Sequence, residues 1–224
     1  MLQALLELLF PNICPGCEER FTPRGHAICT LCHFELPFTD QAVLTENSMT
    51  ERFWGIIPIR HASALLFYEK STLAQTLIHE LKYRNGLRLG RELGRIMGQK
   101  LKQSGRYHQV QAVIPIPLHW RKQWTRGYNQ CEVFGQPLAH ELGVPLLTHV
   151  LKRRRFTKTQ ARLTGTERQQ NMSGAFQIKT NVTGMHILLI DDVMTTGATL
   201  VEAATALHEA GAIVSIGVLA QALN

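Results

Sequence analysis

The chain has 224 residues, with 24 Lys and Arg against 17 Asp and Glu, which gives a formal net charge of +7. At 45% hydrophobic and 18% charged residues it can form a core, so the composition excludes a disordered chain and allows one domain with an appendage or two small domains. The sequence has no run of about 18 or more apolar residues, and we therefore expect no transmembrane helix.

The first ten residues, MLQALLELLF, are predicted to form a short amphipathic helix that ends at Pro11. The segment has no basic residue before its apolar stretch and contains Glu7, so it does not resemble a signal peptide. Its apolar face would pack on the rest of the chain or, as the alternative, lie against a membrane surface.

Four of the five cysteines form two pairs, Cys14-Pro-Gly-Cys17 and Cys29-Thr-Leu-Cys32. Two such turns can place four thiolates around one tetrahedral zinc ion, and the metal would stabilise a segment too short to form a core. Two disulfides or a redox dithiol are the alternative, but the absence of a signal peptide favours a reducing compartment. We therefore predict structural zinc on these four cysteines. The fifth, Cys131, is expected to be a buried helix residue.

The positive charge is concentrated in the middle of the chain. From Lys82 to Asn171 there are 18 basic and four acidic residues, a net charge of +14, whereas the remaining segments carry −7. Such asymmetry indicates a polyanionic partner, and nucleic acid, pyrophosphate and acidic lipid all satisfy it.

A buried strand followed by acids and threonines carries the most specific pattern. Ile187 to Ile190 form an apolar run typical of a parallel strand, with Asp191 and Asp192 after it and Gly197 as a turn before a helix. The backbone N–H groups of Thr195 to Thr199 would converge at the N-terminus of that helix, where an anion is favoured. The two carboxylates would face what is attached to a bound phosphate, such as sugar hydroxyls or a magnesium ion.

This pattern closely resembles the phosphoribosyl pyrophosphate (PRPP) motif of type I phosphoribosyltransferases. The resemblance implies that Asp191 and Asp192 contact the ribose hydroxyls. It also implies that the 5′-phosphate is held by Thr195, Thr196, Gly197, Ala198 and Thr199.

The resemblance also suggests roles for residues of the basic segment between Lys82 and Asn171. Val110 to Ile116 is predicted to be a strand. In the resembled fold the loop after the corresponding strand binds pyrophosphate, which assigns this role to Arg121 and Lys122, with Arg126 also suitably placed. A helix is expected from about Asn129 to Leu142, with a kink at Pro137, and a further strand from Leu146 to Leu151.

Residues 152–171 contain seven basic residues without apolar periodicity, which indicates a functional loop. Its position matches the flexible catalytic loop of the phosphoribosyltransferases, so Arg154 and Lys158 are predicted to act with the acid pair in catalysis by neutralising the leaving pyrophosphate. Cations beside aromatic residues also suit single-stranded DNA. The predicted DNA-binding residues are Lys152, Arg153, Arg155, Arg126, Lys82 and Arg84.

The whole order of motifs resembles the ComF family, which includes ComFC-like and GntX-like proteins. The segments that carry the resemblance are the cysteine pairs, LIHELKYRNG, PIPLHWRKQWTRGYNQ, RRRFTKTQARLTGTERQQN and DDVMTTGAT. It implies a four-cysteine zinc finger (1–36) fused to a phosphoribosyltransferase-like α/β domain (37–224), whose open, mainly parallel sheet is flanked by helices. It further implies a cytoplasmic protein of natural transformation, with peripheral inner-membrane contact as an alternative, and partners that include a competence helicase-like ATPase and a recombination mediator.

Two functions are compatible with these residues. A binding module would hold PRPP or a nucleotide in the pocket while its basic surface binds single-stranded DNA. An enzyme would move the phosphoribosyl group of magnesium-bound PRPP to a base or amine and release pyrophosphate. The sequence identifies no acceptor, and natural transformation is the preferred overall interpretation.

Overall fold

The protein is described from a computed structural model covering residues 12–70, 72–83, 86–118, 124–153 and 174–223. A four-stranded parallel sheet forms its centre, in the order β1 (Ala62–Tyr68), β6 (Ile213–Ala222), β5 (His186–Met194) and β2 (Ala112–Pro115). The first five residues of β5 are buried, as the continuous apolar run predicted, because helices cover both faces of the sheet.

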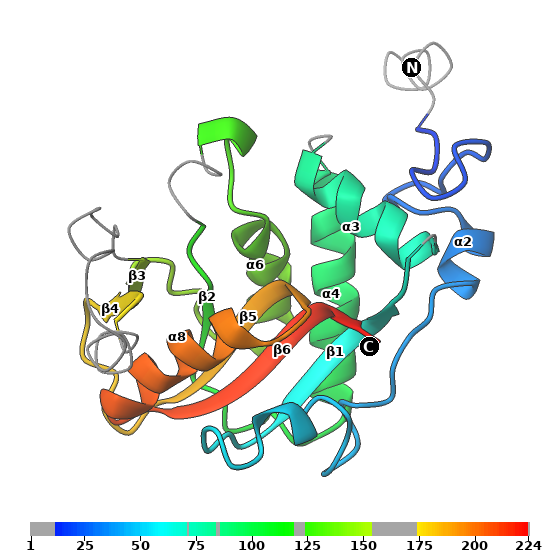
Figure 1. Ribbon diagram of the computed structural model, residues 1–224. Helices are drawn as coiled ribbons and strands as arrows, with labels where there is room; N and C mark the ends of the chain where they lie inside the picture. Colours follow the sequence, from blue (N-terminus) through cyan, green and yellow to red (C-terminus); the bar gives the residue numbers. More distant parts are fainter. Residues whose placement is uncertain (1–11, 71, 84–85, 119–123, 154–173, 224) are drawn as a thin grey trace.

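The helices divide between the two faces of the sheet (Figure 1). Helix α8 (Ala198–Glu209) lies on one face, where its buried residues share a hydrophobic cluster with Ile187 and Leu189. Helices α3 (Leu73–Tyr83), α4 (Leu87–Gln103) and α6 (Gln130–Leu142) lie on the other, in a second cluster that includes Leu188 and Ile190. Alternate residues of β5 therefore anchor opposite layers.

Helices α4 and α6 pack closely because α4 presents a glycine to its neighbour. A Cβ atom at Gly94 would clash with the backbone of Phe134, so the backbones can approach only without a side chain there. This close approach fixes α6 against the sheet and hence the position of its first turn, which faces the candidate site.

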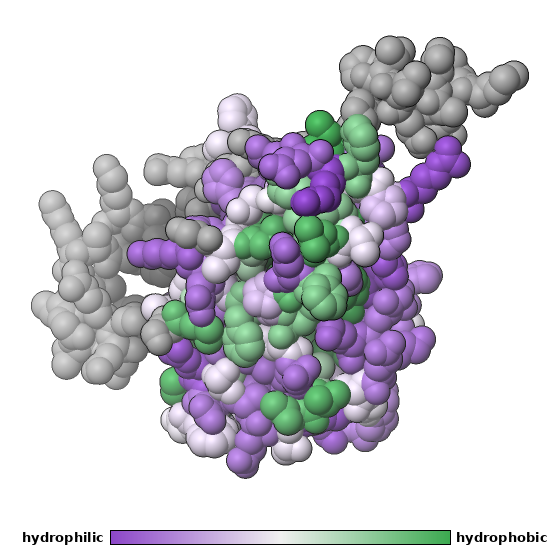
Figure 2. Space-filling model, turned by 90° about the vertical axis from the view of Figure 1, so that its right-hand side faces the viewer, coloured by the Kyte–Doolittle hydropathy of each residue, from purple (hydrophilic) through white to green (hydrophobic). Residues whose placement is uncertain are grey.

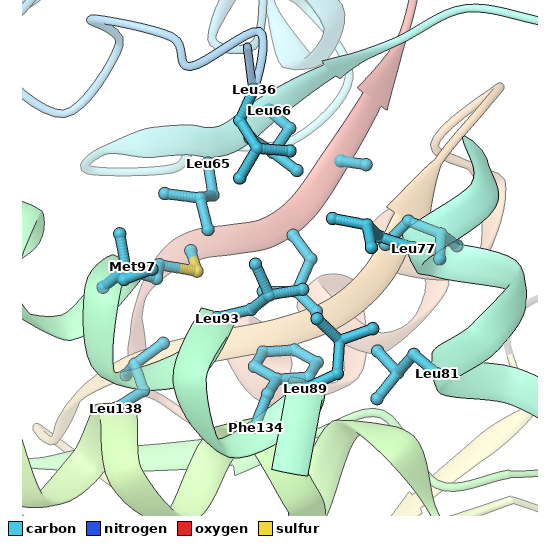
Figure 3. Close-up of a cluster of buried hydrophobic side chains, with 14 of the residues drawn as sticks. Leu36, Leu65, Leu66, Leu77, Leu81, Leu89, Leu93, Met97, Phe134 and Leu138 are labelled. Carbon is cyan, nitrogen blue, oxygen red and sulfur yellow. The ribbon is translucent and has the colours of Figure 1, made fainter. Parts of the chain in front are cut away.

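The four paired cysteines and the residues around them, 12–36, form a cysteine module that packs directly on this helical face. Its short helix α2 (Thr30–Phe34) and the buried Cys14, Ile28 and Cys32 belong to the same hydrophobic cluster as α3 and α4. Leu36 extends that contact to Leu65 and Leu66 of β1 (Figure 3). The division of the chain after residue 36 stays a prediction, because both parts contribute to one core.

A buried carboxylate also joins the module to α4. Glu92 is 6% exposed, and its Oε1 lies 2.8 Å from Nδ1 of His26, while its Oε2 accepts a hydrogen bond from the backbone N–H of Ala27. Arg88, one turn earlier, donates to the carbonyl oxygen of His26 at 3.0 Å and to the side chain of Asn12. Polar contacts thus reinforce the apolar docking.

Part of residues 37–55, for which the sequence indicated little, covers the outer edge of β1. Thr39 N donates to Leu65 O at 3.0 Å and Phe67 N donates to Pro37 O at 2.9 Å, which satisfies backbone groups that an edge strand leaves open. The single-turn helix η1 (Glu51–Phe53) follows, and its buried Phe53 joins the cluster beneath α8.

Most predicted elements are confirmed with shifted bounds, and one is wrong. The strand at 110–116 is β2, and the helix at 129–142 is α6, which continues through Pro137. The predicted strand from Leu146 to Leu151 is two separate pieces. Leu146 forms a single parallel bridge with Val113, whereas β3 (Leu151–Arg153) pairs antiparallel with β4 (Phe176–Ile178) outside the main sheet. The predicted N-terminal helix lies outside the described residues.

The module side of the molecule exposes apolar groups among hydrophilic ones (Figure 2). Phe34 is 86% exposed and Phe21 is 69% exposed, because a segment of this length lacks the volume to enclose every apolar side chain. Within the described ranges, no helix combines the length and apolarity that a membrane crossing requires.

Candidate phosphate and metal sites

The candidate phosphate site lies where β2 leaves the sheet. The last backbone bond between β2 and β5 runs from Ile116 N to Ile190 O at 2.9 Å, and prolines on both sides of Ile116 prevent further pairing. Strand β5 continues to Met194 along β6 alone. Asp191 and Asp192 therefore lie inside β5, whereas the sequence analysis placed them after the strand. Because β2 ends before them, they have no strand among the described residues next to them on that side of β5.

The first turn of α6 faces these two acids. Asn129 caps the helix, accepting from Cys131 N at 3.0 Å and donating to Ile116 O at 3.1 Å, so the helix begins where β2 ends. From that turn, Gln130 Nε2 donates to Asp192 Oδ2 at 3.0 Å, and the buried Cys131 thiol lies 3.5 Å from Asp191 Oδ1.

Burial governs the charge of the acid pair. It raises the pKa of the Asp191 carboxyl to about 7, and the adjacent negative charge of Asp192 acts in the same direction. The backbone N–H of Asp192, 2.9 Å from Asp191 Oδ1, partly opposes this rise. Burial also raises the pKa of the Cys131 thiol, which is therefore a neutral donor. Near neutral pH, Asp191 is thus poised to take up or release a proton.

Two cations that were predicted to bind DNA lie near the acid pair. Lys82, from the last turn of α3, places its Nζ atom 3.0 Å from Asp192 Oδ2. Arg126 Nη1 donates at 3.0 Å to Gln130 Oε1, and the amide of Gln130 bonds to the same carboxylate. Their role in DNA binding remains a prediction. In the structure, Lys82 contacts Asp192 directly and Arg126 bonds to Gln130, which bonds to Asp192.

The predicted phosphate loop precedes α8 as expected. Gly197 adopts a φ of 80°, a left-handed conformation that favours glycine, and forms the N-cap without a side-chain hydrogen bond. Thr195 and Thr196 are exposed, and Met194 and Phe53 lie under the glycine. A helix N-terminus without a side-chain cap, flanked by exposed hydroxyls, can accept an anion.

The other predicted cations fall into two groups. Lys152 and Arg153 belong to β3, where Lys152 is exposed and the guanidinium of Arg153 lies 5.5 Å from the ring centroid of Phe176. Six predicted residues lie outside the described part of the chain: Arg84, Arg121, Lys122, Arg154, Arg155 and Lys158.

Sequence reasoning missed three polar residues of this site. Gln130 and Cys131 bond to the acids, and the Tyr128 hydroxyl donates to Leu81 O at 2.6 Å, which ties the segment before α6 to the end of α3. Tyr128 and Gln130 end the segment PIPLHWRKQWTRGYNQ and Cys131 follows it directly, so membership of or proximity to that motif was the available signal.

The four paired cysteines form a second site, in which every pair of sulfur atoms lies within 4.8 Å. Cys17 Sγ and Cys29 Sγ are 3.9 Å apart, close to the separation of about 3.8 Å that tetrahedral Zn–S bonds of about 2.3 Å require. None of these cysteines forms a disulfide. Backbone hydrogen bonds from Glu19 and Arg20 lower the pKa of Cys17 to about 6, which favours its thiolate. The donor set fits zinc, which would link the two CxxC turns.

Comparisons with known proteins identify relatives of this chain. Competence protein F of Haemophilus influenzae is 30% identical over 206 residues, which cover 89% of this chain and 86% of that protein. The chain belongs to the ComF family. Another member, competence protein ComFC of Bacillus subtilis, is 36% identical over 105 residues, 46% of this chain and 41% of that protein. DNA utilization protein YhgH of Salmonella typhimurium is 35% identical over 139 residues, 61% of each chain.

The family model of the phosphoribosyl transferase domain matches residues 129–223, which contain β5, the acid pair and α8. This ComF protein therefore has a phosphoribosyltransferase-type fold, with a mainly parallel sheet flanked by helices. The region aligned with a solved hypoxanthine phosphoribosyl transferase of Trypanosoma cruzi covers 67% of this chain and 76% of that protein chain. The sequence identity is 14% and the TM-score is 0.36.

Proposed function

We propose that this protein acts in the uptake or use of external DNA, binding single-stranded DNA through its basic surface and PRPP or a nucleotide in the pocket at Asp191 and Asp192. The names of its relatives, competence proteins and DNA utilization proteins, support the DNA role. The observation that carries the proposal is that two cations of the basic segment reach the acid pair: Lys82 contacts Asp192 directly, and Arg126 is linked to it through Gln130.

The pocket can be tested through ligand stabilisation. A ligand at 100 times its Kd stabilises the folded state by about 2.7 kcal/mol. For a chain of this length, each kcal/mol raises the melting temperature by about 2–4 °C. We expect PRPP to raise the melting temperature of the wild type, whereas Asp191→Asn with Asp192→Asn should abolish the ligand-induced rise. Asp40→Asn, an exposed carboxyl outside the site, is the matched control. A wild type that PRPP leaves unchanged would contradict the pocket.

The DNA interaction is tested by its salt dependence. Each phosphate neutralised on a single strand contributes a slope of about −0.7 to log K against log salt. Replacing Arg153, Arg154 and Arg155 by Gln should flatten that slope by up to about 2, measured by fluorescence anisotropy with a labelled oligonucleotide. Lys70→Gln, outside the basic segment, should leave it unchanged. Affinity that does not vary with salt would exclude an electrostatic DNA surface.

A phosphoribosyltransferase activity is the second candidate, favoured by the raised pKa of Asp191. In such a reaction a bond forms between ribose C1 and the acceptor nitrogen, and the bond from C1 to pyrophosphate breaks. The pyrophosphate leaves with the electron pair, and the proton lost by the acceptor passes to the Asp191 carboxylate. Measuring pyrophosphate release across nucleobases and amines separates this enzyme from a binding module.

A further inference from the structure

The acid pair already has a cationic partner within the chain. The Lys82 and Asp192 side chains are 23% and 10% exposed, and 3.0 Å separates Lys82 Nζ from Asp192 Oδ2. Such an ion pair, largely withdrawn from water, is stronger than one on an open surface. Lys82 was predicted to bind DNA, yet its ammonium lies against the acid pair.

The rest of the fold holds the ammonium there. Lys82 follows the fully buried Leu81, and the hydroxyl of Tyr128 donates to the Leu81 carbonyl at 2.6 Å. That hydroxyl belongs to the segment that leads into α6, whose Gln130 bonds to the same carboxylate oxygen as Lys82. The two elements that reach Asp192 are thus fixed to each other, which restricts where the lysine side chain can reach.

These bonds leave the pair poorly suited to a divalent cation. Asp192 Oδ2 faces an ammonium and an amide, and Asp192 Oδ1 accepts from Val193 N at 2.8 Å. Asp191 Oδ1 accepts from Asp192 N and from the Cys131 thiol. Magnesium requires carboxylate oxygens that can enter an octahedral shell, whereas three of these four atoms already serve as acceptors. A ribose hydroxyl can donate a further hydrogen bond to such an oxygen, whereas the magnesium ion expected with PRPP would have to displace the ammonium or the amide from Asp192.

We propose that Lys82 is a ligand-binding residue that supplies the positive charge of the pocket, so that a phosphorylated ribose binds without a divalent cation. The inference rests on the proposed phosphoribosyl pocket. Sugar hydroxyls donate to the carboxylates, while the Lys82 ammonium stays paired with Asp192 and attracts an anionic group of the ligand. The arrangement makes magnesium dispensable for occupancy.

Ribose 5-phosphate is a suitable probe, because it carries the phosphate and the hydroxyls but lacks the strongly chelating pyrophosphate. Isothermal titration in magnesium-free buffer, without a chelator that would also remove zinc, and in excess magnesium should give wild-type Kd values that agree within about threefold. Lys82→Met removes the charge and should weaken binding in magnesium-free buffer by about tenfold or more, whereas Lys82→Arg should retain most of the affinity. Lys102→Met, an exposed lysine on α4, is the matched control and should bind as the wild type does.

The outcomes separate this inference from the function on which it rests. Wild-type binding that disappears when magnesium is left out would leave the pocket intact and overturn the role of Lys82. Equal affinity of Lys82→Met and wild type in magnesium-free buffer would overturn it too. Binding in neither condition would refute the phosphoribosyl pocket itself. Melting curves of each variant establish that it is folded, and Lys82→Arg keeps the inference testable if Lys82→Met is not.

Discussion

Asp191 is a carboxyl group that the fold keeps from water beside a second acid, and this opposes folding at neutral pH. Its pKa is about 7 in the folded chain against 3.8 as the ordinary value. Between these values the folded state holds a proton that the unfolded state has released. The free energy of unfolding therefore falls as pH rises from about 4 to about 7, and the loss persists above that window.

Replacing Asp191 by Asn should remove this pH dependence. An amide oxygen can still accept from Asp192 N and from Cys131, and its NH2 group carries no charge next to Asp192. We expect the variant to be more stable than the wild type by at least about 1 kcal/mol at pH 8, since one pKa unit corresponds to about 1.4 kcal/mol, and to approach the wild type at pH 4. Urea unfolding at both pH values measures the difference. A variant less stable than the wild type at pH 8 would contradict the charge assignment.

At the scale of elements, structure formed by residues close in the sequence could be predicted, whereas pairing between distant segments could not. The strand that carries the acids, the glycine turn and α8 are contiguous in the sequence, so their apolar run and helical period indicated both type and order. The two pieces around Leu146 and Leu151 pair with different parts of the chain. Leu146 bridges to Val113 and β3 pairs with Phe176 to Ile178, and both partners are distant in the sequence. No local signal distinguishes one strand from two short ones.

The same distinction applies to the site. Asp191, Asp192 and Gly197 could be identified because one motif contains them. Lys82 could not be assigned to the acids, since that contact depends on α3 ending beside β5, and the charge pattern alone favoured a DNA surface. The proximity of Gln130 and Cys131 to the acids likewise depends on how α4 and α6 pack, which Gly94 permits.

At the scale of the whole molecule, the cysteine module and the α/β layers form one cooperative structure. Cys14, Ile28 and Leu36 belong to the cluster that contains α3 and α4, and Glu92 joins the module to α4 through the backbone of Ala27. Small domains with a shared core unfold in one step. Because a metal that binds only the folded state stabilises it, zinc on the four cysteines would stabilise every layer in contact with the module.

We therefore expect a zinc chelator to lower the temperature of a single unfolding transition, monitored by calorimetry, without producing a separate one for the module. Glu92→Gln should act in the same direction with zinc still bound, because it weakens the buried contacts to His26 and Ala27 by roughly 1–3 kcal/mol. That loss corresponds to about 2–4 °C for each kcal/mol. Glu209→Gln, an exposed carboxylate at the end of α8, is the matched control. If the module melted first while the main transition kept its temperature, the shared core would not couple the two parts. In that case α3 would hold Lys82 at the acid pair without help from the metal.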